Sequence, residues 1–261
     1  PLLRAARRTH EEGRFSLSIN AARLGTDAAD RSGGASAKAE ARIRMADTLI
    51  AMGETQEATR IIRQAQDIGH LDRRTQARMW NRLGEIESQN GNLEAAHQYL
   101  QSAEVAFEAT RDRDGLMETA HLMANLKKLE GRPMEAARHY ARMLRLNRND
   151  RRIEVQALRG LVDSRSSSGR LTGVEPLVQQ LREAALATGD TRCMAQATFA
   201  AGLVELALQD FDSGERHFHT ARALAATVGD HRLQLDSENN LGEVYRMRGE
   251  MRAAERMYKS V

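Results

Sequence analysis

Glycines recur along the chain at a nearly constant spacing, and this recurrence constrains the fold more than any other feature. The glycines lie at intervals of 40, 38, 40, 38 and 80 residues, at Gly13, Gly53, Gly91, Gly131, Gly169 and Gly249. The last interval equals two periods of 40, and the turn that it skips falls at Gln209-Asp210. Such a period is typical of repeat arrays, in which each repeat packs only against its neighbours.

Small side chains keep a fixed distance from these turns. Five residues after the turns, with Val174 as the exception, small residues stand at Ser18, Ala58, Ala96, Ala136, Gly214 and Ala254. Seven residues before the turns, with Val162 as the exception, they stand at Ala6, Ala46, Gly84, Ala124, Gly202 and Gly242. Two antiparallel helices approach closely only where the facing side chains are small. The pattern therefore predicts a helical hairpin at each turn, with larger residues such as Leu100, Tyr140, Phe218 and Tyr258 packed around the crossing.

Composition agrees with an all-α fold. The chain has only 3 Pro and 4% aromatic residues, which leaves little that favours strands. No apolar run is long enough for a membrane span, and Arg4, Arg7 and Arg8 interrupt any signal-peptide core. The single cysteine, Cys193, excludes an internal disulfide, so the cytoplasm is the expected compartment.

The segment from Trp80 to Gly84, followed by Ala96, Leu100 and Ala103, resembles the tetratricopeptide repeat. The copy from Asn239 to Tyr258 resembles the longer-helix variety, which is similar to repeats in kinesin light chains and in bacterial regulators of the maltose-activator type. The resemblance covers essentially the whole chain. It implies a single right-handed superhelical α-solenoid of about seven helical hairpins with a period of 38–40 residues. The expected repeats are residues 1–32, 37–72, 75–113, 115–151, 154–189, 193–229 and 234–261.

The hairpin around Gly169 departs from the pattern. Val162, Val174 and Leu181 occupy positions that are small in most other repeats. Thr172-Gly173-Val174-Glu175 has the form of a capping box, which predicts that the second helix starts late, with Pro176 in its first turn. We expect a local change of superhelical pitch over residues 155–190; ordinary sequence drift is the alternative.

The same region carries an excess of arginine. Nine arginines against three acidic residues between Arg138 and Arg170 give a local charge of +6, which leaves −3 for the rest of the chain. We name its first six members the basic stripe: Arg138, Arg142, Arg145, Arg148, Arg151 and Arg152. An acidic partner segment could bind the stripe through Arg–carboxylate pairs. The alternative is an ordinary solvated surface, since a GC-rich genome encodes arginine in place of lysine throughout a protein.

The resemblance also implies where a partner would bind, because the first helix of each hairpin lines the concave face of such solenoids. The residues three before and one after the small position of each first helix are Ile43 and Asp47, Asn81 and Glu85, His121 and Asn125, Arg159 and Asp163, Phe199 and Leu203, and Asn239 and Glu243. In this family, groove asparagines hydrogen-bond the main chain of the ligand, and Asn81, Asn125 and Asn239 match those positions. Solvent-facing asparagines are the alternative. The Lys and Asn clamp of chaperone-binding members is not reproduced.

Signatures of catalysis are missing from the sequence. It has no Gly-rich phosphate loop, Gly-x-Ser-x-Gly elbow or His-Glu-x-x-His helix, and His217 and His219 point to different sides of a helix. We therefore expect neither enzymatic activity nor a cofactor or metal, but a scaffold or sensor that binds a peptide or protein on its concave face. RNA binding by a helical-repeat code is the alternative, disfavoured by acidic residues on the same face.

The ends of the chain raise a further expectation. The chain starts within one expected helix and stops within another, without a polar capping helix. We expect it to be part of a longer protein, as a regulatory array attached to a kinase, ATPase or transcription-regulator domain, and its end faces to allow end-to-end association.

Overall fold

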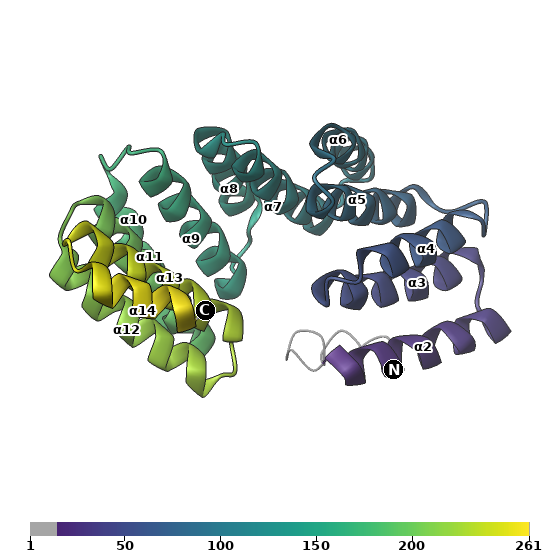
Figure 1. The fold of residues 1–261 in the computed structure, drawn as a ribbon. Helices are drawn as coiled ribbons and strands as arrows, with labels where there is room; N and C mark the ends of the chain where they lie inside the picture. Colours follow the sequence, from purple (N-terminus) through teal and green to yellow (C-terminus); the bar gives the residue numbers. More distant parts are fainter. Residues whose placement is uncertain (1–14, 261) are drawn as a thin grey trace. The chain divides into compact units, whose positions relative to one another are not determined.

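The structure is a computed structural model that describes residues 15–260, and these residues form thirteen α-helices without a strand (Figure 1). The expectation of an all-helical repeat fold is confirmed. The described residues divide into two compact units, unit 1 ending at Glu130 and unit 2 beginning at Gly131. Gly13 and Ala6, which belong to the predicted first hairpin, lie outside the described residues. None of the described helices is sufficiently long and apolar to cross a bilayer.

Unit 1 contains six of the described helices. They are α2 (Phe15–Ser32), α3 (Ala35–Ala51), α4 (Thr55–Gln66), α5 (Arg73–Gln89), α6 (Leu93–Thr110) and α7 (Arg113–Leu129). Helices α3 and α4 form one antiparallel hairpin and α5 and α6 another, and Ile62 and Ile86 lie in the core between these hairpins. The first-helix positions of the repeats are taken by α3, α5 and α7, so these three helices form the first-helix face of unit 1.

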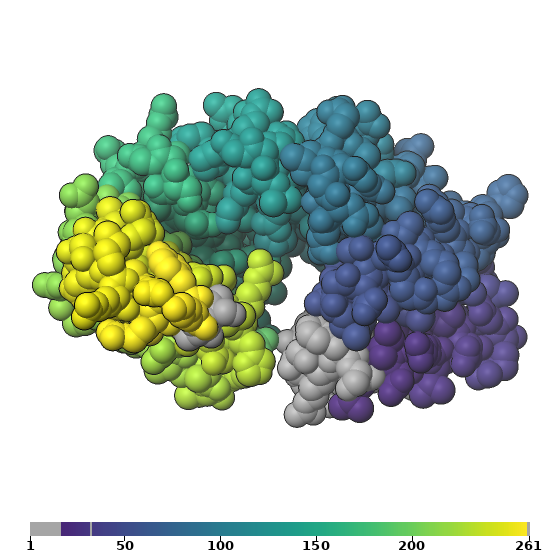
Figure 2. Space-filling view, viewed as in Figure 1, coloured from purple at the N-terminus to yellow at the C-terminus, as the bar shows by residue number. Residues whose placement is uncertain are grey.

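Unit 2 contains seven helices within the described range. They are α8 (Pro133–Leu146), α9 (Arg151–Ser167), α10 (Val174–Thr188), α11 (Thr191–Ala207), α12 (Phe211–Thr227), α13 (His231–Met247) and α14 (Met251–Ser260). The hairpins are α9–α10, α11–α12 and α13–α14, so that α9, α11 and α13 form the first-helix face of this unit. Figure 2 shows α14, in yellow, at the surface of unit 2, where Met251 is 61% exposed.

The turns inside the hairpins lie at the recurrent glycines, and there the backbone is left-handed. Gly53, Gly91 and Gly249 have φ angles of 79°, 82° and 82°, which residues with a Cβ atom rarely adopt. At the skipped turn, Gln209 takes the same left-handed conformation with φ of 63°. The turn therefore has the same backbone geometry where glycine is absent, and the period of 40 residues continues through it.

The small positions are the points where paired helices cross. A Cβ atom added to Gly202 on α11 would lie 2.8 Å from the ring of Phe218 on α12, and one added to Gly84 would lie 2.7 Å from Leu100. Gly242 has the same relation to Tyr258. These glycines let a large side chain of the second helix lie against the backbone of the first, which confirms the predicted packing of three of the four larger residues. The fourth, Tyr140, lies against Gly160 of α9.

Each first helix from α5 onward begins with an aspartate whose carboxylate accepts a hydrogen bond from a backbone N–H of the first turn. These N-caps are Asp72, Asp112, Asp150, Asp190 and Asp230. Their spacing of 40, 38, 40 and 40 residues repeats the period of the turn glycines. The caps satisfy N–H groups that a helix start otherwise leaves open, and they fix where each first helix begins.

The irregular hairpin starts its second helix late, as predicted. Helix α10 begins at Val174, five residues after Gly169, whereas α6 and α14 begin two residues after their turn glycines. The predicted capping box is wrong, because Gly173 is the N-cap with φ of 74° and no side-chain cap bond forms there. Six residues, 168–173, therefore separate the end of α9 from the start of α10.

Candidate functional site

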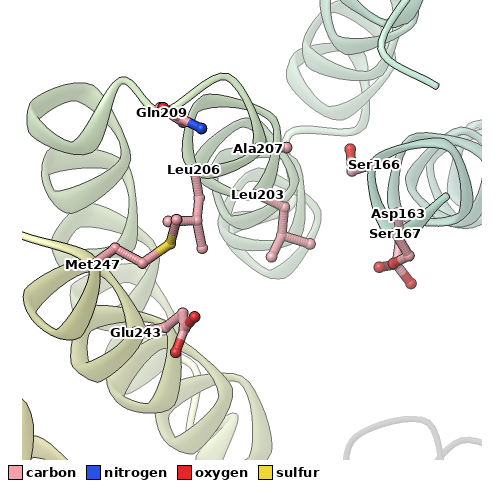
Figure 3. Close-up of a pocket in the computed structure, with 9 residues that line it drawn as sticks. All are labelled: Asp163, Ser166, Ser167, Leu203, Leu206, Ala207, Gln209, Glu243 and Met247. Carbon is pink, nitrogen blue, oxygen red and sulfur yellow. The ribbon is translucent and has the colours of Figure 1, made fainter. Parts of the chain in front are cut away.

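A pocket of about 320 Å³ opens on the first-helix face of unit 2 (Figure 3). Its lining comes from three successive first helices and the turn after α11, and consists of Asp163, Ser166, Ser167, Leu203, Leu206, Ala207, Gln209, Glu243 and Met247. Asp163, Leu203 and Glu243 occupy one equivalent position in their repeats, 40 residues apart. The structure therefore brings together three of the residues that the sequence places one position after the crossing point.

The pocket combines an apolar wall with carboxylates. Figure 3 shows Met247 reaching from α13 toward Leu206 of α11, with Leu203 on the same helix. Nε of Arg246 donates to Oε2 of Glu243 at 2.8 Å, and Oη of Tyr258 donates to the same oxygen at 3.3 Å. The Arg246 bond is the main reason why the pKa of Glu243 lies below its usual range. Glu243 is therefore ionised at neutral pH, at one side of an aliphatic surface.

The first-helix face of unit 1 carries a network of charges around Arg82 of α5. Its guanidinium donates to Oε1 of Glu118 on α7 at 2.6 Å and binds Asp47 on α3, and Glu85 lies 3.6 Å away. The Arg82 side chain is only 11% exposed, whereas Glu85 and Glu118 keep 31% and 37% exposure. One arginine thus holds carboxylates from three first helices.

Burial and neighbouring charge act on these groups in opposite directions. Burial raises the pKa of Glu85, and the carboxylates of Asp47 and Glu118 raise it further. Burial also opposes ionisation of Glu118, but the charge of Arg82 and the bond from it outweigh that effect and lower its pKa. The three carboxylates keep the pKa of Arg82 well above its usual value despite its own desolvation. Of the two glutamates, Glu85 is therefore the more easily protonated.

Asn81 is fully buried and its amide is used inside unit 1. Its Nδ2 donates to Glu118 Oε2 at 3.3 Å, and its Oδ1 accepts from Oγ1 of Thr119 at 2.9 Å. With no exposed surface, Asn81 orients Glu118 and offers nothing to a partner in this arrangement. In contrast, Asn125 and His121 are half-buried on α7, with Nδ2 of Asn125 3.2 Å from Nε2 of His121.

Comparison with known proteins agrees with this architecture. A family model described as tetratricopeptide repeat matches residues 193–261, and a second model of the same description matches residues 77–104. These segments contain the Gly202, Gly242 and Gly84 crossings. The chain carries tetratricopeptide repeats. The comparison with curated protein sequences finds no match.

Solved structures share the tetratricopeptide fold at low sequence identity. A signal transduction ATPase with numerous domains and a tetratricopeptide repeat sensor, from Pyrococcus horikoshii, is 16% identical with a TM-score of 0.71, covering 99% of this chain and 42% of its own. The Rap conjugation gene regulator of plasmid pLS20, in complex with a Phr peptide, is 13% identical with a TM-score of 0.77, covering 99% and 71%. A kinesin light chain-type protein from Podosopora anserina with nearly identical repeats is 15% identical with a TM-score of 0.52, covering 72% and 94%. This chain thus spans less than half of the Pyrococcus protein.

The remaining predicted contact residues lie on first helices of unit 2. Arg159, one turn before Asp163 on α9, is half-buried, and its Nε makes no hydrogen bond. Asn239, one turn before Glu243 on α13, is exposed. Neither residue lines the pocket. Phe199, one turn before Leu203, is only 8% exposed, and its ring packs in the core against that of Phe218 at an interplanar angle of 58°.

The basic stripe is mostly at the surface of unit 2. Arg138, Arg142 and Arg145 share one face of α8, where Arg142 alone is half-buried. The other members, at and after the end of α8, are exposed, and two of them bind carboxylates: Arg151 lies 2.7 Å from Glu154 and Arg152 lies 3.0 Å from Asp190. Exposed pairs of this kind contribute little to stability, so their arginines can exchange partners.

Several residues of the site were not predicted from the sequence. Ser167, Ala207 and Met247 line the pocket one helical turn after Asp163, Leu203 and Glu243, and extending the register by four residues would have found them. Arg82 was missed, although an arginine stands two residues before the crossing position in both Arg44 and Arg82. Across residues 15–260 there is no group of three or more side chains suited to holding a metal ion.

Proposed function

We propose that this chain is a protein-interaction module that holds a segment of a peptide or protein on the first-helix face of unit 2. The observation that supports the proposal best is the pocket itself. Three equivalent positions of three successive repeats, Asp163, Leu203 and Glu243, line one cavity of about 320 Å³. That volume lies at the small end of the range for ligand pockets, and it suits a single side chain of a longer partner.

The structural relatives support a peptide partner and a regulatory role. The pLS20 Rap regulator was solved in complex with a Phr peptide, and the Pyrococcus ATPase is described as having a tetratricopeptide repeat sensor. By analogy, the module proposed here is a sensor or scaffold without catalytic activity, which acts on a further domain of a longer protein. The single cysteine favours a reducing compartment such as the cytoplasm.

RNA binding is the weaker candidate. The carboxylates of Asp163 and Glu243 stand in the pocket, and those of Glu85 and Glu118 are partly exposed on the first-helix face of unit 1. Such groups repel a phosphate backbone. The exposed arginines of the basic stripe supply a second surface, on which an acidic segment of the same protein partner could bind.

Selection from a random dodecapeptide phage library on the full chain tests the proposal. Leu203→Glu places a charge on the apolar wall, and Leu186→Glu is the matched control, because Leu186 is 62% exposed on the second helix α10. We expect enriched peptides to bind Leu203→Glu roughly tenfold more weakly than wild type and to bind Leu186→Glu unchanged. Failure to enrich any peptide, or equal binding to both variants, would count against the proposal; circular dichroism melting confirms that each variant is folded.

A further inference from the structure

Four of the five aspartate N-caps are followed, two residues later, by an arginine. Three of these arginines form an ion pair with the N-cap aspartate of the next first helix. The pairs are Arg74 with Asp112 at 2.7 Å in unit 1, and Arg152 with Asp190 at 3.0 Å and Arg192 with Asp230 at 4.0 Å in unit 2. Each of these arginines therefore marks the place where the following first helix begins.

Arg232 of α13 is the fourth arginine of this series, and it lacks such a carboxylate. It stands two residues after the Asp230 cap, is exposed, and makes no hydrogen bond or ion pair within residues 15–260. The other three arginines meet a carboxylate because a following first helix supplies one. Arg232 thus presents a cation where its three equivalents bind an N-cap aspartate.

Leu235, one turn after Arg232, is exposed at a position that other first helices bury. Its side chain is 41% exposed, whereas the equivalent Ala77, Val155 and Ala195 are fully buried. Each of these three packs in a core with a residue of the following first helix, namely Leu116, Cys193 and Leu233. Leu235 therefore occupies an interface position whose covering helix is missing from the described residues.

Tyr258 shows the same contrast on the second helix of the hairpin, α14. It is 44% exposed, whereas Leu100 of α6 and Phe218 of α12, which also stand nine residues after their turns, are fully buried. Those two side chains share a core with the following first helix, through Leu122 of α7 and Leu241 of α13. The exposed surface therefore extends over both helices of the α13–α14 hairpin.

A cation and two apolar side chains thus outline the surface that a following hairpin would cover, and we name Arg232, Leu235 and Tyr258 the open face. We propose that the open face binds an α-helical hairpin of a partner protein, whose first helix begins with an aspartate N-cap. The aspartate pairs with Arg232, and a small or apolar side chain of that helix lies on Leu235 and Tyr258. None of the three residues lines the pocket, so this surface goes beyond the proposed function.

The charge and the packing of the open face both specify this occupant. The charge is complementary to an acidic cap, as in the three Arg–Asp pairs within the chain. The packing continues the established contact of α13 on α11, in which Leu233 lies in one core with Ala195. Exposed ion pairs are weak, so we expect Arg232 to set the register of the bound helix, and Leu235 and Tyr258 to supply most of the affinity.

A second copy of the chain fits the open face less well. Four of the five aspartate N-caps are already bound within their own unit, by Ser36, Arg74, Arg152 and Arg192. A copy that offered one of these caps would first have to break an interaction that its own stacking provides. This favours a different polypeptide as the partner.

A library of designed tetratricopeptide arrays tests the assignment. Arrays of three or more consensus hairpins are stable on their own, so the N-terminal side of the first hairpin, its N-cap included, can be randomised. The library is displayed on phage and selected on the full chain. We expect the enriched arrays to carry aspartate at that N-cap and to bind Leu235→Glu at least tenfold more weakly than wild type. Leu186→Glu, at a 62% exposed position of α10, is the control and should leave binding unchanged.

A double-mutant cycle isolates the Arg–Asp pair. In an enriched array the N-cap is changed from aspartate to serine, which caps a helix about as well without the charge. This change should weaken binding to the wild-type chain roughly two- to fivefold, as an exposed ion pair does, and should have no effect on binding to Arg232→Gln. Arg182→Gln, which removes an exposed arginine of α10, is the control and should keep the full difference.

Three outcomes would overturn the proposal. They are enriched arrays without a preference for an acidic N-cap, an equal effect of the serine cap on wild type and Arg232→Gln, and failure to enrich any array that loses affinity for Leu235→Glu. Sedimentation velocity of the chain alone tests the second copy as occupant. We expect wild type and Leu235→Glu to sediment alike; a concentration-dependent dimer that Leu235→Glu abolishes would assign the open face to self-association instead. Circular dichroism melting checks that each variant is folded.

Discussion

Nη2 of Arg82 on α5 donates to Oε1 of Glu118 on α7 at 2.6 Å, so one hydrogen bond joins the first helices of two successive repeats. The same guanidinium binds Asp47 of α3. In unit 1 the acidic register positions, Asp47 and Glu85, thus both interact with one arginine, Arg82. In unit 2 the equivalent acidic positions, Asp163 and Glu243, line a pocket, and Glu243 is paired with Arg246 of its own helix. The same repeat position therefore serves cohesion in one unit and, in our proposal, recognition in the other.

Arg82→Met should destabilise unit 1, because it leaves three carboxylates close together without their shared cation. We expect a loss of about 2–3 kcal/mol, below the 3–5 kcal/mol typical of a fully buried pair, since Glu85 and Glu118 retain solvent contact. Urea unfolding followed by the fluorescence of Trp80, the only tryptophan, measures the effect in the same helix. Arg60→Met, which removes an exposed ion pair with Glu57, is the control and should leave the midpoint unchanged. Equal effects of the two substitutions would refute a special role for Arg82.

Gly202→Ala and Gly214→Ala should have opposite effects, although both glycines are buried in the α11–α12 hairpin. A Cβ at Gly202 would lie 2.8 Å from the Phe218 ring, whereas the nearest atom to a Cβ at Gly214 is 3.6 Å away. We expect Gly202→Ala to cost about 1–3 kcal/mol through overpacking. Gly214→Ala should stabilise the fold by up to about 1 kcal/mol, because alanine has lower backbone entropy than glycine in the unfolded chain. Thermal melting by circular dichroism compares them, and a loss of stability in both would show that crossing geometry is not the cause.

Asp72→Ala should remove a pH-dependent contribution to stability. Ser36 Oγ donates to this N-cap carboxylate at 2.7 Å, and with the bonds from Thr75 it lowers the pKa of Asp72 from 3.8 to about 2. Because the folded-state pKa is depressed, the contribution is complete above pH 3.8 and is lost as the pH falls through about 2. The stability difference between wild type and variant should be about 1 kcal/mol near neutral pH, typical of an N-cap, and shrink below pH 3.8. Trp80 fluorescence in urea measures it, and a difference that is constant down to the acid limit would contradict the assignment.

Cys193 should be unreactive in the folded chain. The side chain is 7% exposed, and burial raises the pKa of its thiol, so little thiolate is available at neutral pH. Labelling with N-ethylmaleimide should be slower by roughly two orders of magnitude in native buffer than in urea. Mass spectrometry follows the single adduct. Labelling at the same rate in both conditions would show that α11 does not shield the thiol.

The sequence was sufficient to predict the hairpins because crossing and turning are both set by residue size. Gly202 and Phe218 face each other as expected, and Gln209 shows that the period fixes a turn even where the expected glycine is absent. The cap of α10 could not be predicted in the same way. Thr172 fits a capping box in sequence, but the left-handed backbone of Gly173 starts the helix one residue later than that box requires.

The candidate site was less accessible to sequence reasoning. The register places Asp163, Leu203 and Glu243 on one face, but their convergence on a pocket depends on how α9, α11 and α13 pack. Asn81 shows the limit of the register, because the same spacing that predicted an exposed amide places it under Glu118 and Thr119. Contacts between repeats, such as those of Arg82 with Asp47 and Glu118, depend on distances between packed helices, which the sequence period does not give.

Site-specific photo-crosslinking tests most directly whether a partner lies on the first-helix face of unit 2. A benzophenone maleimide is attached to Ser167→Cys, at the edge of the pocket, or to Glu183→Cys on the second helix α10; buried Cys193 should not compete for the label. With a peptide selected on the wild-type chain, we predict a crosslinked product from Ser167→Cys and none from Glu183→Cys. Equal crosslinking from both positions, or crosslinking from Glu183→Cys alone, would contradict the proposed binding face.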